Sequence, residues 1–143
     1  MPTIPPVRPK SYREKVFFKK LRSQVDGNAL VEQGLIQIKG VGRQFAKAVV
    51  KIADVDPETR IGALTEKNLN EVEEIILDPL SHGIPPWMVN LKKDSSSGEN
   101  LHLVGNRLDL QVKRDIDRMK RNRSFKGLYH KLKVRVRGKR NRR

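Results

Sequence analysis

Lysine and arginine are concentrated at the C-terminal end of this 143-residue chain. Residues 119–143 hold 12 of its 31 basic residues and no Asp or Glu. Unpaired charges cannot be buried in a hydrophobic core, so this segment must lie in water or against a polyanion. Many of these residues are arginine, which suits forked contacts to phosphate better than lysine does. The chemistry that this pattern predicts is recognition of a polyanion.

The rest of the charge is also distributed unevenly. Residues 1–25 carry seven basic residues and one acidic residue, whereas residues 26–118 carry 12 basic and 15 acidic residues. The formal net charge is +15 and the pI is near 10.5. Nucleic acid is the partner that such basic ends favour, because Lys and Arg release the counterions of phosphates. An anionic membrane surface and a merely solvated tail are the alternatives.

Other chemistries have less support in the sequence. The three histidines are His82, His102 and His130. None shares a helical face with another histidine or a carboxylate at ligand spacing, so we predict no metal site. Glu71, Glu73 and Glu74 could in principle form a catalytic carboxylate pair, but a solvated helix face is the favoured interpretation. The chain has no Cys and no convincing Ser–His arrangement, so we expect neither an enzyme nor a cofactor.

Two glycines and two cations lie together in the sequence Ile38-Lys39-Gly40-Val41-Gly42-Arg43. Glycine lets the backbone turn sharply and approach a ligand closely. The helix expected to follow would point its N-terminal N–H groups outward, which favours a phosphate. A tight interhelical turn with solvated flanks is the alternative. We predict that Lys39, Gly40, Gly42 and Arg43 contact nucleic acid.

Aromatic and basic residues alternate between residues 121 and 140. Phe125, Tyr129 and His130 could stack on bases while neighbouring cations hold phosphates. In the alternative interpretation, Phe125 and Leu128 cap the core of the preceding helix. The nucleic-acid-binding candidates in this part of the chain are Lys113, Arg114, Arg118, Arg121, Arg123, Lys126, Tyr129, His130, Arg135, Arg137, Lys139, Arg140 and Arg142.

A mainly helical fold must position these groups. Apolar spacing and capping residues predict helices over residues 29–38, 43–53, 65–78 and 107–122. The core candidates of the first three are Leu30, Val31, Leu35, Ile38, Phe45, Val49, Ile52, Leu69, Val72, Ile75 and Ile76. The last helix carries an apolar stripe of Leu108, Val112, Ile116 and Met119. The longest apolar runs are too short to cross a bilayer.

The remaining segments are less regular. We expect residues 1–20 to form a basic, proline-rich arm, followed by a helical core over residues 21–79. An insertion over residues 80–105 has room for a short β-hairpin, and Trp87 is expected to anchor it to the core. The long helix over residues 106–123 then leads into a basic tail over residues 124–143. The expected apolar anchors near the N-terminus are Val16, Phe17, Phe18 and Leu21.

Taken in order, these motifs resemble one family, the universal ribosomal protein of the small-subunit head, called thirteen in bacteria and eighteen in eukaryotes. The resemblance runs from Leu21 to Arg140. It rests on residues 26–28, 38–43, 56–60, 62–65, 83–87, 90–94, 114–118, 127–130 and 136–140. Two of these, 83–87 and 90–94, resemble an insertion of archaeal and eukaryotic members that bacterial members lack. The tail departs from the family pattern, because Tyr129 replaces an Arg and Lys139 replaces a Gln.

The resemblance implies a mainly α fold, with a helix–two-turn–helix core, a long C-terminal helix, an irregular insertion and extended basic tails. It implies binding to ribosomal RNA of the small-subunit head, beside the head protein called nineteen in bacteria. It also implies a bridge to a large-subunit protein and a tail near transfer RNA in the decoding region. The expected location is the cytoplasmic ribosome, with nucleolar transit if the source is eukaryotic.

We expect no membrane partner and no homo-oligomer. The alternative function is a DNA-binding or repair module that uses a helix-hairpin-helix.

Overall fold

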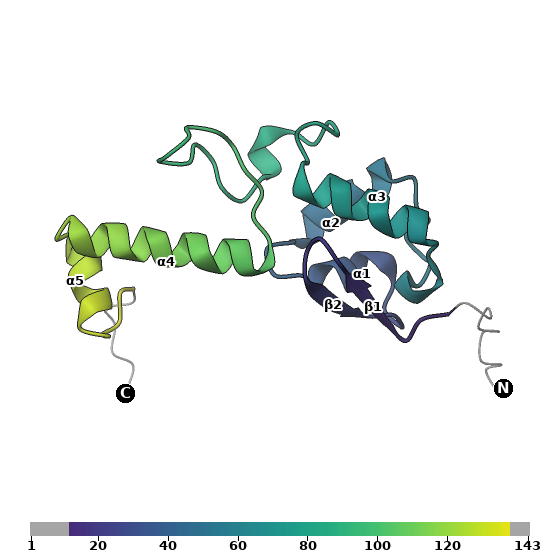
Figure 1. Ribbon diagram of the computed structural model, residues 1–143, viewed down its shortest axis with the longest axis horizontal. Coiled ribbons are helices and arrows are strands. Elements are labelled where there is room, and N and C mark those ends of the chain that lie inside the picture. Colours follow the sequence, from purple (N-terminus) through teal and green to yellow (C-terminus); the bar gives the residue numbers. More distant parts are fainter. Residues whose placement is uncertain (1–11, 138–143) are drawn as a thin grey trace. The chain divides into compact units, whose positions relative to one another are not determined.

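The computed structural model describes residues 12–137 (Figure 1). Five α-helices, two β-strands and two short 3-10 helices lie along these residues. This confirms the predicted fold class, mainly α with a long C-terminal helix. The chain divides into two compact units, Met1–Gly105 and Asn106–Arg143.

A small antiparallel hairpin begins the first unit. Strand β1 (Lys15–Phe18) pairs with β2 (Ser23–Asp26), and Val16 lies opposite Val25. Successive side chains of a strand point to opposite faces, so Val16 and Phe18 are buried whereas Phe17 is 60% exposed. The residue pattern predicted no strand here, and the assignment of Phe17 as an apolar anchor is wrong.

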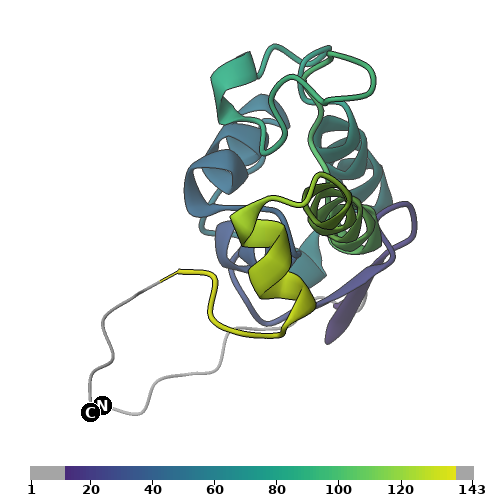
Figure 2. The same cartoon turned by 90° about the vertical axis from the view of Figure 1, so that its left-hand side faces the viewer.

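Three helices complete the core of this unit. They are α1 (Val31–Ile36), α2 (Arg43–Ile52) and α3 (Glu66–Leu77), with the 3-10 helix η1 (Ile61–Ala63) before α3. Helices α2 and α3 lie side by side in both views (Figures 1 and 2). These helices confirm the predicted ones, with α1 shorter than expected.

The apolar faces of these helices form one hydrophobic cluster with the hairpin. Most predicted core residues are buried there: Val31, Leu35, Ile38, Phe45, Val49, Leu69, Val72, Ile75 and Ile76. Leu30 and Ile52 are each 37% exposed, so their assignment to the core is wrong. Leu30 precedes α1 and pairs its backbone with Arg60, while Ile52 ends α2. Both stand at helix ends, and their neighbours Val31 and Ala53 are buried in the core instead.

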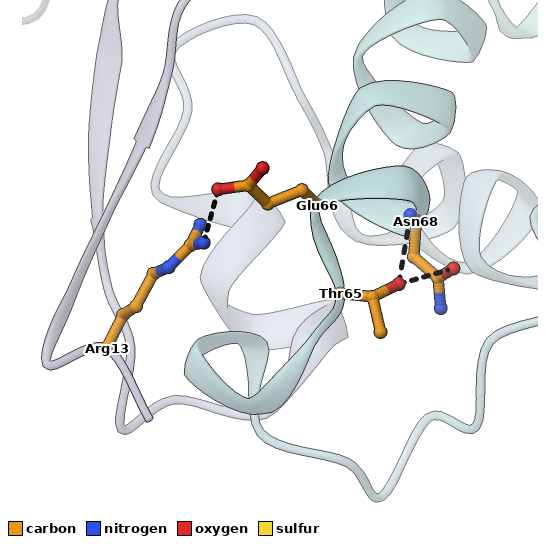
Figure 3. Close-up of polar contacts among 4 residues, drawn as sticks. All are labelled: Arg13, Thr65, Glu66 and Asn68. Carbon is orange, nitrogen blue, oxygen red and sulfur yellow. Dashed lines mark hydrogen bonds and ion pairs between the residues drawn. The ribbon is translucent and has the colours of Figure 1, made fainter. Parts of the chain in front are cut away.

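Helix α3 has the N-cap that its sequence predicts. The Thr65 hydroxyl accepts a hydrogen bond from the Asn68 N–H at 3.4 Å and donates one to Asn68 Oδ1 at 3.0 Å (Figure 3). In the same close-up, the Arg13 guanidinium meets the Glu66 carboxylate at 2.6 Å. Arg13 also donates its backbone N–H to Gly62 at 3.1 Å. Arg13, just before β1, is therefore tied through its side chain to the start of α3 and through its backbone to η1.

Glu73 holds the turn of the hairpin against α3. Its side chain is buried, and its Oε1 accepts the Lys20 backbone N–H at 3.2 Å. Burial raises the pKa of Glu73, whereas the Lys20 ammonium, 2.7 Å from Glu74, lowers the pKa of that exposed carboxylate. The interpretation of this glutamate cluster as a solvated helix face is therefore wrong for Glu73.

The insertion is anchored by different residues from those expected. Trp87 lies in the 3-10 helix η2 (Pro86–Met88) and is 68% exposed, so its role as the anchor is wrong. Its neighbour Met88 turns toward the core instead, because adjacent residues of a tight turn point in different directions. His102 is buried and stacks on Phe45 of α2, with ring centroids 3.9 Å apart. The expected hairpin is reduced to one antiparallel bridge between Leu91 and Leu101.

The second unit consists of α4 (Gly105–Arg121), whose first residue closes the first unit, and α5 (Phe125–Lys131). Figure 2 looks along α4 and shows α5 crossing its end. The Ser124 hydroxyl caps α5 by accepting the Gly127 N–H at 3.1 Å, and it donates to the Met119 carbonyl at 3.0 Å. A Cβ atom on Gly127 would lie 2.1 Å from that carbonyl oxygen, so glycine permits this corner.

No residue of α4 is buried within the described part of the chain. Val112, in the middle of the predicted apolar stripe, is 48% exposed. None of the helices in residues 12–137 is long and apolar enough to cross a membrane.

The buried histidine makes stability depend on pH. Both ring nitrogens of His102 are buried without a hydrogen-bond partner in the described residues, and burial lowers its pKa from 6.5 to about 4. Between these values the unfolded chain binds more protons than the folded chain, so the free energy of unfolding falls as pH falls. We expect His102→Phe to flatten this dependence while changing stability at neutral pH by less than about 1.5 kcal/mol.

Urea unfolding monitored by circular dichroism gives the free energy of unfolding of the wild type and of His102→Phe. Measurements at neutral pH and at about pH 5 give both the change at neutral pH and the pH dependence. Equal losses of stability in the two proteins on acidification would show that another group titrates.

Candidate nucleic-acid interface

The predicted glycine turn joins α1 to α2. Gly40 has φ 105°, a left-handed conformation that L side chains rarely adopt. Gly42 is the N-cap of α2 at φ −94° and ψ 167°, which any residue can adopt, and a Cβ atom there would meet nothing within 4 Å. Val41 between them is buried. The backbone therefore requires glycine at position 40 but not at position 42.

The start of α2 carries uncompensated positive potential. Gly42 provides no side-chain cap, and the first turn holds no acidic residue. The first backbone N–H groups of a helix have no intrahelical partners and favour an anion. Arg43 is exposed beside them, and the Lys39 carbonyl accepts the Gly105 N–H at 2.8 Å. This hydrogen bond fixes the turn to the end of the insertion, so the predicted phosphate contact has a rigid base.

Two further cations of α2 were not among the residues predicted to bind nucleic acid. Lys47 and Lys51 are exposed and follow Arg43 at intervals of four residues. Their four-residue spacing was visible in the sequence, because residues four apart share one face of a helix. The glycine turn is therefore continued by a basic stripe, defined here as Arg43, Lys47 and Lys51.

The other candidates lie in the second unit, on α4, on α5 and beyond. The exposed basic ones are Lys113, Arg114, Arg118, Arg121, Arg123, Lys126, Arg135 and Arg137. Arg118 meets Asp115 at 3.3 Å, and Lys120 meets Asp117 at the same distance. Exposed pairs of this kind are weak, so phosphate can compete with the aspartates for these cations.

The aromatic residues of α5 are accessible. Phe125 is 81% exposed, Leu128 47% and Tyr129 37%, so the interpretation that Phe125 and Leu128 cap the helix core is wrong. His130 is half-buried. Exposed aromatic rings next to cations can stack on unpaired bases, which remains a prediction for this surface.

The structure does not bring all candidates into one site. Lys39, Gly40, Gly42 and Arg43 belong to the first unit, whereas the α4 and α5 candidates belong to the second. Lys139, Arg140 and Arg142 lie outside the described residues. Within residues 12–137, no three His, Asp or Glu side chains are grouped as metal ligands would be.

Comparison with known proteins shows a single family. The family model described as ribosomal protein S13/S18 matches residues 20–143. A small ribosomal subunit protein uS13 from Methanobrevibacter smithii is 40% identical over 119 residues, which cover 83% of this chain and 81% of that protein. The uS13 protein of Hyperthermus butylicus is 43% identical over 120 residues, covering 84% and 80%. That of Methanocaldococcus jannaschii is 38% identical over 126 residues, covering 88% and 84%.

The two glycines of the turn should respond differently to alanine. Gly40→Ala forces a side chain into a left-handed conformation and should lower the free energy of unfolding by about 1–3 kcal/mol. Gly42→Ala should change it by less than about 0.5 kcal/mol. If the start of α2 binds a phosphate, the added Cβ should still weaken RNA binding by about 1–3 kcal/mol, because it separates the N–H groups from the ligand.

Thermal unfolding and RNA titrations of both variants check these outcomes. A Gly40→Ala protein as stable as the wild type would refute the backbone argument. If Gly42→Ala binds RNA with unchanged affinity, no phosphate binds at the start of α2.

Proposed function

Because this chain belongs to the ribosomal protein S13/S18 family, we propose that it is a structural constituent of the small ribosomal subunit that binds ribosomal RNA. The observation that carries this function is the match over residues 20–143, with about 40% identity to archaeal uS13 proteins along most of both chains. The family assignment confirms the prediction that the chain is not an enzyme. The archaeal relatives agree with an insertion of archaeal and eukaryotic type.

The charges of the chain supply the binding mechanism. Every Lys and Arg within residues 12–137 is exposed, so none of them is buried in the hydrophobic core and all are accessible to a ligand. Each cation that settles on a phosphate releases condensed counterions, which makes the affinity strong and salt-dependent. The turn at Gly40 and the α5 corner add rigid backbone positions from which these cations reach the RNA.

The finer location is the head of the subunit, beside the head protein called nineteen in bacteria. The apolar stripe of α4 supports a protein neighbour, because Val112 is 48% exposed within the described residues. A bridge to a large-subunit protein and contact of the tail with transfer RNA complete the proposal. The basic tail supports the transfer RNA contact through its charge alone.

The protein then works in the cytoplasm as part of the ribosome. Transit through the nucleolus during assembly belongs to this proposal only for a eukaryotic source.

Removing residues 131–143 tests the RNA-binding role of the tail. This deletion removes eight Lys and Arg residues. Each phosphate bound by the protein contributes about 0.7–0.9 to the slope of log K against log salt, so the slope should flatten by that amount for every phosphate that the shortened chain no longer binds. The unfolding midpoint of the first unit should not change, because the core lies within residues 16–104.

Filter binding to purified small-subunit ribosomal RNA over a salt series gives the slope. A full-length variant with the same eight residues changed to Gln is the control, because it keeps chain length and removes charge. Equal slopes in the wild type and both variants would contradict RNA binding by the tail.

A further inference from the structure

Helix α2 has two chemically distinct faces. Phe45, Ala46, Val49 and Val50 are buried in the hydrophobic cluster, which fixes the orientation of the helix. The basic stripe of Arg43, Lys47 and Lys51 lies on the exposed side. Each step of four residues advances about 6 Å along the axis and turns by about 40°, so the stripe extends about 12 Å along one side of the helix. It runs lengthwise from the glycine turn.

The positive charge of this stripe is not compensated within the described residues. None of its three side chains forms an ion pair or hydrogen bond there, and α2 contains no Asp or Glu. Other cations have carboxylate partners: Lys20 meets Glu74 of α3 at 2.7 Å, and Arg118 meets Asp115 within α4 at 3.3 Å. The stripe thus consists of three exposed cations of one helix that have no ion-pair partner among residues 12–137.

This arrangement is unfavourable for the isolated helix. Like charges four residues apart destabilise a helix by about 0.2–0.5 kcal/mol for each pair. Arg43 also opposes the helix macrodipole, because a cation stands at its positive end. A polyanion lying along the stripe would remove both penalties. The stripe therefore suits a linear polyanion better than it suits solvent.

RNA fits this stripe better than an acidic protein does. Two of its three cations are lysines, which are depleted at the cores of protein interfaces but are common partners of phosphate. The other exposed residues of α2, such as Gln44, introduce no carboxylate and no large aromatic anchor. The steps of about one helical turn are comparable to the separation of successive phosphates in one strand.

We propose that α2 lies lengthwise along one strand of ribosomal RNA, with Arg43, Lys47 and Lys51 on successive phosphates. This inference rests on the proposed function and deepens it, because it names the ligand of each cation. It differs from end-on docking, in which only the glycine turn and Arg43 reach the RNA. The lengthwise arrangement requires Lys51, about 12 Å from Arg43 along the axis, to contribute as much as Arg43 does.

The substitution Lys51→Gln in the full-length protein separates the two arrangements. The matched control is Lys67→Gln, which makes the same charge change at an exposed position of α3, the helix that carries Glu66, Glu71 and Glu74. We expect Lys51→Gln to lower the salt slope of binding to purified small-subunit ribosomal RNA by about 0.7–0.9, because the variant binds one phosphate fewer. Lys67→Gln should leave the slope unchanged. Lys47→Gln should behave like Lys51→Gln.

The outcomes distinguish failure of the inference from failure of the proposed function. If the wild type binds the RNA with a steep slope but Lys51→Gln matches Lys67→Gln, the lengthwise arrangement is overturned. An unchanged slope combined with loss of Lys51→Gln from assembled subunits would assign the stripe to an acidic protein and would also overturn the inference. A wild type without affinity for this RNA would refute the proposed function itself.

Discussion

An unpaired cation cannot be buried without a large cost in free energy, and the distribution of basic residues in the described part of the chain follows from this constraint. Every Lys and Arg in residues 12–137 is exposed. The buried ionisable residues of this region are Glu73 and His102. Glu73 is held by the backbone of Lys20, and His102 stays neutral because burial lowers its pKa to about 4. The hydrophobic cluster therefore forms without enclosing any Lys or Arg of the described residues.

The same constraint places the cations of the helices on their exposed faces. Burying one face of α2 leaves its other face for cations, so packing aims the basic stripe outward as a rigid row. The turn before it is held by buried Val41 and by the left-handed backbone of Gly40. In the second unit, α4 and α5 present cations and the exposed ring of Phe125 without burying any residue of α4. Burial in the core and the proposed RNA contacts are thus assigned to opposite faces of α2.

Local signals were predictable from the sequence, whereas distant contacts were not. The helices were predicted because apolar spacing and the Thr65 cap act within a few residues. The hairpin was missed because its strands have four residues each and Phe17 interrupts the alternation. The burial of Glu73 depends on Lys20, 53 residues away, and no spacing rule reveals it. Trp87 was misplaced because ring size alone does not decide burial in a tight turn. The basic stripe, by contrast, could have been recognised from its four-residue spacing.

In the proposed function, RNA contacts hold this chain in the small ribosomal subunit. Sedimentation of a native lysate through a sucrose gradient at low and high salt, with this chain followed by antibody, tests the claim most directly. We expect the chain to migrate with small subunits and whole ribosomes at both salt concentrations, because many phosphate contacts and a protein neighbour bind it to the subunit. Migration near the top of the gradient, or with chromatin, would contradict the claim.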